Sequence, residues 1–82
     1  MEIKVLGPGC AKCREAEEIV RAVVREARSD ARVEKVTDLR EMMALGVMAT
    51  PAVVIDGKIK CAGRVPAPAE VRDWISGPDA AV

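Results

Sequence analysis

Hydrophobic and polar residues alternate at the start of the chain and then change to a helical spacing. Ile3 and Val5 alternate with charged neighbours, and the run stops at Gly7-Pro8-Gly9, which predicts a strand and a turn. From Ala16 onward, apolar residues recur three and four positions apart, which predicts one buried helix face: Ile19, Val20, Val23, Val24 and Ala27. A second short strand is predicted over residues 33–36.

The middle of the chain has the pattern of a short helix. Asp38 followed by Glu41 three positions later is typical of an N-terminal capping box, in which each side chain bonds the other's backbone N–H. Gly46 has the position of a helix end. The apolar side chains of this helix and of its exit loop are expected to pack inward: Leu39, Met42, Met43, Leu45 and Met48.

The last third predicts a hairpin followed by a helix. The apolar run over residues 52–55 suits a buried strand, Asp56-Gly57 is a strong two-residue turn signal, and residues 58–62 return antiparallel. Pro68 opens the last helix and Gly77-Pro78 ends it. This helix is expected to pack three apolar side chains on the sheet: Val71, Trp74 and Ile75.

The predicted order of elements is βαβαββα, which defines an α/β fold. A strand, a crossover helix and a second strand form a parallel pair, and the hairpin adds two antiparallel strands beside the first. The result is a mixed four-stranded sheet of order 2-1-3-4 with helices on both faces. We expect one domain over residues 1–77 and a loose C-terminal tail over residues 78–82.

Composition excludes several classes of function. The 13 basic and 13 acidic side chains cancel, whereas a nucleic-acid binder carries a basic surplus. The most apolar stretch, residues 47–55, is too short to span a bilayer, and the N-terminus lacks a signal-peptide core. We therefore expect a cytoplasmic protein with no membrane partner. In that reducing compartment, a close cysteine pair is catalytic or metal-binding more often than structural.

Cys10-Ala11-Lys12-Cys13 lies between the first strand and the first helix. The unpaired N–H groups and the dipole of a helix start stabilise a thiolate, and Lys12 adds a nearby positive charge. Cys13 lies three residues later on the same helical side, within bridging distance. We expect Cys10 to be the exposed nucleophile and Cys13 to resolve the mixed disulfide.

Two other functions are compatible with this motif. A CxxC pair also holds soft metal ions, and two thiolates suit Cu(I) or trivalent arsenic. Heavy-metal-associated domains place their CxxC similarly, but they usually carry Met where this chain has Pro8, and they end in a strand. The chain lacks histidine, which excludes a mixed Cys/His zinc site. The other alternative is an interaction module locked by its disulfide, although so short a loop contributes little stability.

Three segments together resemble the small thioredoxin-like "redox-active disulfide" proteins, which are minimal relatives of thioredoxins and glutaredoxins. The segments are residues 7–13, residues 46–52 and the hairpin at residues 55–58. The resemblance covers roughly residues 2–75 and implies a minimal thioredoxin fold with Cys10 and Cys13 as the redox pair. It also implies a cis peptide bond before Pro51, and a loop at Thr50 and Pro51 that presents backbone groups to the substrate.

The resemblance also implies partners. These are disulfide-containing protein substrates and a thioredoxin-reductase-like electron donor. We expect no cofactor and no metal, and a monomer, since nothing in the sequence demands a dimer. The chain departs from thioredoxins at Gly9, where they have Trp, and from both relatives at the Ala11-Lys12 spacer. Because no aromatic residue flanks the cysteines, glutathione specificity does not carry over.

The third cysteine, Cys61, lies in the predicted hairpin. If Ile55 pairs with Lys58, a regular register places Ala52 opposite Cys61. Cys61 is then at the same end of the sheet as the CxxC, but about 9–10 Å from the first strand in the hydrogen-bonding direction. We expect a buried core residue, with a third soft ligand or an auxiliary redox thiol as the alternatives.

Overall fold

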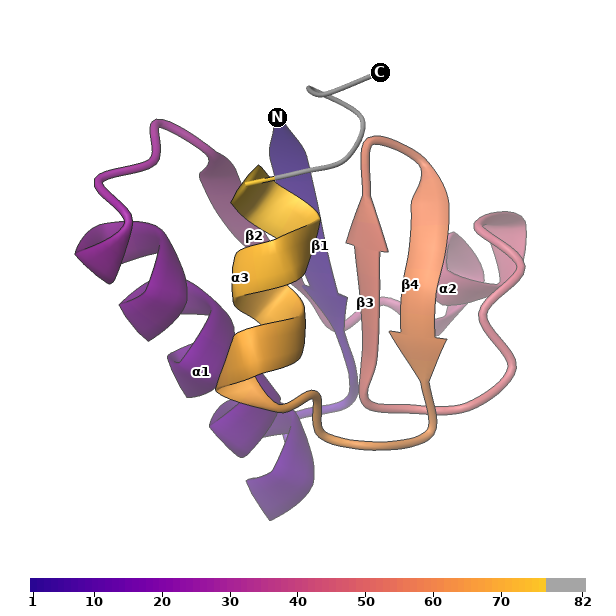
Figure 1. Cartoon of the computed structure of the whole chain (residues 1–82). Coiled ribbons are helices and arrows are strands. Elements are labelled where there is room, and N and C mark those ends of the chain that lie inside the picture. The colour runs from indigo at the N-terminus through magenta and orange to yellow at the C-terminus, as the bar shows by residue number, and fades with distance from the viewer. Residues whose placement is uncertain (77–82) are drawn as a thin grey trace.

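The computed structural model describes residues 1–76 and has the predicted order of elements (Figure 1). The strands and helices are β1 (Glu2–Leu6), α1 (Ala11–Glu26), β2 (Arg32–Val36), α2 (Leu39–Ala44), β3 (Ala52–Ile55), β4 (Lys58–Ala62) and α3 (Pro68–Ser76). The expected helix end at Gly77-Pro78 and the expected tail over residues 78–82 lie outside the described residues.

The four strands form one mixed sheet of order β2-β1-β3-β4, as predicted. β1 pairs in parallel with β2 and antiparallel with β3, and β3 pairs antiparallel with β4. The α/β fold class is therefore confirmed. Among residues 1–76, none of the helices combines the length and the apolar composition that crossing a membrane requires.

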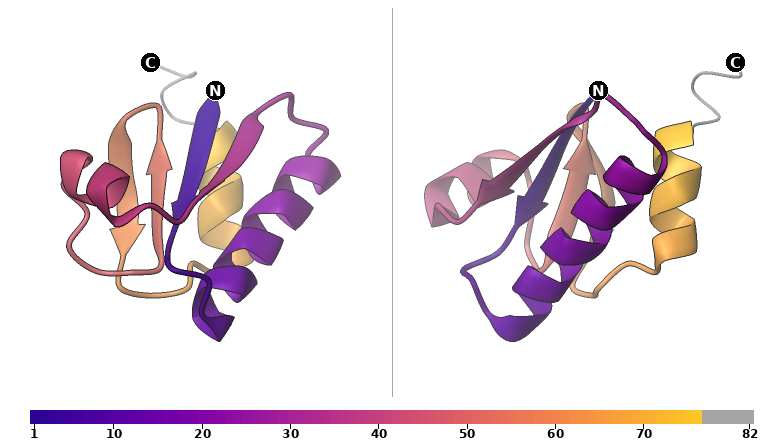
Figure 2. Two further views of the ribbon diagram at one scale, coloured as in Figure 1. Left: turned by 180° about the vertical axis from the view of Figure 1, so that it is seen from behind. Right: turned by 90° about the vertical axis from the view of Figure 1, so that its left-hand side faces the viewer.

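The helices cover both faces of the sheet (Figure 2). α1 and α3 pack on one face over a large aliphatic core, and Trp74 packs against this core as expected. The buried residues of the core are Ile3, Val5, Ala16, Val20, Val23, Val53, Ile55, Cys61 and Val71. α2 covers the other face over a smaller core: Leu6, Val36, Met42, Val47, Ala52 and Val54. Alternation along β1 explains this division, because successive strand side chains point to opposite faces.

The short helix α2 has its predicted ends but only half of the predicted capping box. The Asp38 side chain accepts a hydrogen bond from the backbone N–H of Arg40 at 2.8 Å, and Gly46 ends the helix with a φ of 81°. The Glu41 carboxylate instead lies 3.9 Å from the Lys4 ammonium. Glu41 therefore connects α2 to β1, and within residues 1–76 it makes no return bond to Asp38.

The prediction that all apolar residues of α2 and its exit loop pack inward is wrong. Met42 is buried and Leu45 is partly buried, but Leu39, Met43 and Met48 are 69%, 67% and 94% exposed. The reason is length, because a six-residue helix completes fewer than two turns and directs one side chain squarely at the sheet. Met42 takes that position, and Met48 follows the helix in an exposed loop.

The register of the hairpin also differs from the prediction. Ile55 pairs with Lys58 as expected, but β4 has one extra residue, Lys60, between the partners of Val53 and Val54. This bulge leaves Cys61 opposite Val53 rather than Ala52. An extra residue in one strand shifts every later side chain to the opposite face. Cys61 is buried as expected, but it lies in the core beneath α1 and α3.

Candidate active site

The turn between β1 and α1 places Cys10 at the N-cap of the helix. The Gly7 N–H donates to the Val36 carbonyl at 2.9 Å, which continues the β1–β2 pairing up to the turn. Cys10 has extended backbone angles, and its sulfur accepts a hydrogen bond from the Cys13 N–H at 3.4 Å. The Cys10 sulfur thus occupies the place that a Ser or Asp oxygen takes in an ordinary cap.

The two cysteines of the motif lie in contact at different depths. Their sulfur atoms are 2.8 Å apart, and both side chains are free thiols. Cys10 is exposed, whereas Cys13 is only 4% exposed in the first turn of α1. One sulfur is therefore accessible to a large partner, and the second lies directly behind it.

The surroundings shift the pKa values of the two thiols in opposite directions. The hydrogen bond from the Cys13 thiol, followed by the Cys13 backbone N–H, lowers the pKa of Cys10. Lys12 contributes to that lowering through its backbone N–H. Burial, followed by the hydrogen bond to Cys10, raises the pKa of Cys13. The pair therefore loses its first proton at the exposed sulfur and keeps the second proton at the buried one.

Gly7 also belongs to the site, although the sequence pattern indicates only a turn there. A side-chain carbon on Gly7 would lie 2.9 Å from the Cys13 β-carbon and would overlap the Cys13 sulfur. Glycine is needed here because Cys13 closely approaches the backbone at the end of β1. The sequence places Gly7 directly after a strand and three residues before Cys10. This position could have indicated its role beside Cys13, but an ordinary turn glycine has the same position.

The loop before β3 lies beside Gly7 at the end of β1. The Thr50–Pro51 peptide bond is cis, and Pro51 is buried with its carbonyl accepting from the Gly63 N–H at 2.9 Å. The Thr50 β-carbon lies 3.8 Å from the point where a Gly7 side chain would begin, beside Cys13. β3 pairs with β1, so the end of one strand and the start of the other meet here.

Cys61 takes no part in this arrangement. Its thiol lies 3.9 Å from the Arg64 carbonyl, and burial raises its pKa. Arg64 in turn makes a double hydrogen bond to the Glu70 carboxylate, both contacts at 2.7 Å, which holds the pKa of Glu70 at about 2. The residues that come together near the end of β1 are therefore Cys10, Cys13, Gly7 and Thr50.

The donor set at the cysteines also limits what metal could bind. Within residues 1–76, no group of three or more His, Cys, Asp or Glu side chains is placed to hold a metal ion. A metal at this position would be held by two thiolates, as soft monovalent ions accept. Such a pair also forms and breaks a disulfide with no further group.

Selective alkylation tests the opposite pKa shifts. At pH 7, iodoacetamide is expected to modify Cys10 first, because the thiolate reacts and only Cys10 has a lowered pKa. The Cys10 rate should titrate with a midpoint below the free-thiol value of about 8.5, and the Cys13 rate with a midpoint above it. Peptide mapping by mass spectrometry measures both rates, with buried Cys61 as the slow internal control. Faster labelling of Cys13 would contradict the assignment.

Comparison with known proteins agrees with this geometry. One relative is a protein named thioredoxin from Methanothermobacter thermautotrophicus, 34% identical over 76 residues, which are 93% of this chain and 99% of the relative. Another is a protein named thioredoxin from Methanocaldococcus jannaschii, 38% identical over 71 residues, or 87% of this chain and 81% of the relative. The protein is a thiol–disulfide oxidoreductase. It belongs to the thioredoxin domain family, whose model matches residues 1–76.

Proposed function

We propose that the chain reduces protein disulfides with Cys10 as nucleophile and Cys13 as resolving thiol. The Cys10 thiolate attacks one sulfur of the substrate disulfide, forms a mixed disulfide and releases the other substrate sulfur as a thiolate. Cys13 then loses its proton and attacks the Cys10 sulfur. The second substrate thiolate leaves, and the two electrons of the dithiol have passed to the substrate.

The contrast between the two thiols carries this proposal. Cys10 is exposed with a lowered pKa, and Cys13 is buried with a raised pKa, at a distance of 2.8 Å between sulfur atoms. A nucleophile must be accessible and ionised, whereas a resolving thiol acts only after the mixed disulfide has formed beside it. Burial of Cys13 also keeps it from reacting with the substrate first.

The Thr50–Pro51 loop is proposed to position the substrate beside Cys10. Thr50 lies beside the Gly7–Cys13 contact, and backbone groups of such a loop can pair with the chain that flanks a substrate cysteine. Lys12 is proposed to assist Cys10 through its backbone N–H. Cys61 has no proposed step.

The biological setting follows from the same site. Both cysteines lie on one chain, so a monomer with a single domain over residues 1–77 is sufficient. The two relatives are named thioredoxin, which supports a reductase-like electron donor that returns Cys10 and Cys13 to the dithiol. A dithiol that must be regenerated suits a reducing compartment such as the cytoplasm.

A redox titration tests this function. In glutathione buffers, the Cys10–Cys13 pair is expected to behave as a reversible two-electron couple, roughly between −180 and −300 mV, the range of glutaredoxin- and thioredoxin-like sites. Mass spectrometry after acid quenching counts the oxidised fraction. A parallel titration with Cu(I) examines the soft-metal alternative. Tight stoichiometric Cu(I) binding without a reversible disulfide would overturn the proposal and favour a metal carrier.

A further inference from the structure

A groove of about 340 Å³ lies between α1 and α3, on the face of the molecule away from α2. Figure 2 shows the two helices side by side on this face. The floor of the groove is apolar, with Ile19 and Val23 from α1 and Pro68 from the start of α3. This volume lies in the range of functional ligand sites.

The charged residues of the groove are predominantly acidic. Glu15, Glu18 and Glu26 line it from α1, and Arg72 is the basic residue among the lining residues. Within the described part of the chain, none of these three carboxylates forms an ion pair, unlike Glu17, which pairs with Arg21 at 2.9 Å. The lining residues therefore carry a net negative charge, although the whole chain has none.

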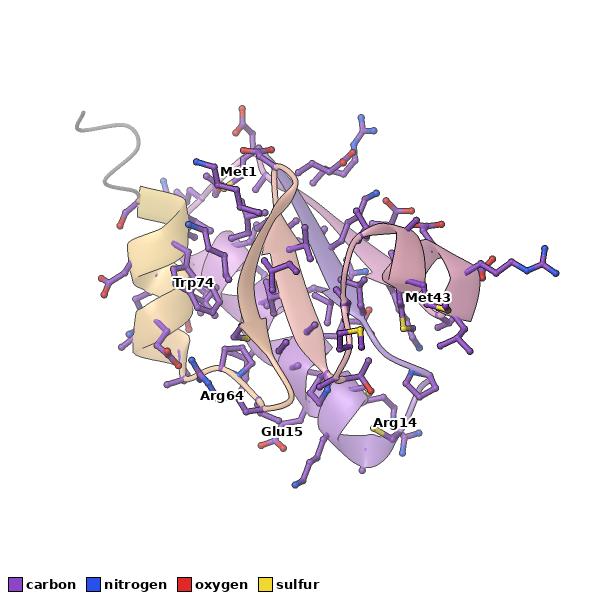
Figure 3. The ribbon with its side chains drawn as sticks, turned by 90° about the vertical axis from the view of Figure 1, so that its right-hand side faces the viewer. Met1, Arg14, Glu15, Met43, Arg64 and Trp74 are labelled. Atoms are coloured by element: carbon purple, nitrogen blue, oxygen red, sulfur yellow. The ribbon has the colours of Figure 1, made fainter. Side chains whose placement is uncertain are left out.

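The groove begins at the redox end of the molecule. Glu15 is two residues beyond Cys13, and α1 and α3 both start at that end (Figure 1). Figure 3 shows Glu15 there, close to the start of α1 with Arg14. Glu15 and Glu18 lie near this end of the groove, and Glu26 lies about 16 Å from Glu15 along the helix, at 1.5 Å per residue.

We propose that this groove binds a basic, amphipathic segment of the protein that exchanges disulfides with Cys10. This inference rests on the function proposed above. The occupant is a segment with apolar side chains for the floor and Lys or Arg at intervals of three or four residues. Such a spacing matches Glu15 and Glu18, and Glu26 lies eight residues further along the same side of α1. When the groove binds this basic segment of the partner, the partner's disulfide is held near Cys10.

Two peptide disulfides provide the test. Each carries one disulfide, a short Gly-Ser spacer and an amphipathic leucine segment with lysine in one peptide and glutamate in the other. At low salt, the wild-type chain is expected to reduce the lysine peptide with a kcat/KM about tenfold higher than for the glutamate peptide. The difference should come mainly from a lower KM. At 0.5 M salt the difference should shrink, because the Debye length falls below 5 Å.

Charge reversal on the groove is expected to invert that preference. The variant carries three substitutions at exposed positions of α1: Glu15→Lys, Glu18→Lys and Glu26→Lys. A matched control makes the same change in charge at exposed carboxylates outside the groove: Glu2→Lys, Asp30→Lys and Glu34→Lys. The control variant should keep the preference for the lysine peptide.

The possible outcomes distinguish failure of the docking groove from failure of the proposed disulfide reductase function. Equal reduction of both peptides by the wild-type chain, or loss of the preference in both variants alike, would overturn the groove as a docking site. Reduction of 2-hydroxyethyl disulfide, which is small and uncharged, measures the chemistry alone and should be equal in all three proteins. Absence of that reaction would instead overturn the proposed function. Anisotropy of a labelled, disulfide-free lysine peptide measures binding without any redox step.

Discussion

Replacement of Cys10 by serine is expected to abolish disulfide reduction, whereas Cys13→Ser should retain the first half of the reaction. In Cys10→Ser the only remaining thiol of the pair is buried and has a raised pKa. In Cys13→Ser the exposed Cys10 still attacks, but no thiol lies behind it to release the substrate. After incubation with a peptide disulfide, non-reducing mass spectrometry should show a stable adduct on Cys10 in Cys13→Ser and no adduct in Cys10→Ser.

Cys61→Ser is the matched control for these two variants. Cys61 is a third cysteine of the same chain, buried in the core and without a step in the proposed reaction. Its replacement should leave the rate of disulfide reduction unchanged, even if the hydroxyl in the core lowers stability. A stable adduct on Cys13 in the Cys10→Ser variant would reverse the assigned roles.

Gly7→Ala is expected to disturb the site through one added methyl group. The new carbon would overlap the Cys13 sulfur, so Cys13 must shift, and we expect its contact with Cys10 to be lost. Loss of the hydrogen bond between the two thiols removes the largest contribution that lowers the pKa of Cys10. The iodoacetamide rate at pH 7 should therefore fall, with its midpoint moving up toward the free-thiol value. Overpacking should also cost about 1–3 kcal/mol in the free energy of unfolding.

Gly57→Ala separates the local effect of Gly7→Ala from a general loss of stability. Gly57 has a φ of 84° in the β3–β4 turn, and no atom lies within 4 Å of an added side-chain carbon. Alanine there is strained by about 1–2 kcal/mol through its backbone conformation alone. The Gly57 variant should be destabilised with an unchanged pH profile at Cys10. An unchanged profile in both variants would show that Gly7 does not position Cys13.

The order of elements and the cysteine pair could be predicted because their signals are local. The alternation along β1, the helical spacing along α1 and the Asp56-Gly57 turn each occupy a short stretch of sequence. Each signal names one element, and the crossover rule then restricts how β1 and β2 can pair. The position of Cys10 at the N-cap of α1 followed from the same two neighbouring elements.

The errors arise where the outcome depends on contacts between distant segments. The bulge in β4 sets the face of Cys61, and the Asp56-Gly57 turn alone gives no sign of it. The exposure of Met43 depends on how much of the sheet α2 can cover, and Met42 already fills that space. Gly7 has its importance only because Cys13 folds back against it.

The position of Cys61 beneath α1 and α3 gives the molecule an internal reporter of opening. A thiol reagent reaches it when the two helices separate from the sheet, because its side chain is 7% exposed in the closed state. With excess reagent, the labelling rate of Cys61 therefore measures how often α1 and α3 separate from the sheet, without an added probe. Comparison of the Cys61 labelling rate between dithiol and disulfide samples would show whether oxidation of Cys10 and Cys13 makes the separation of α1 and α3 from the sheet less frequent.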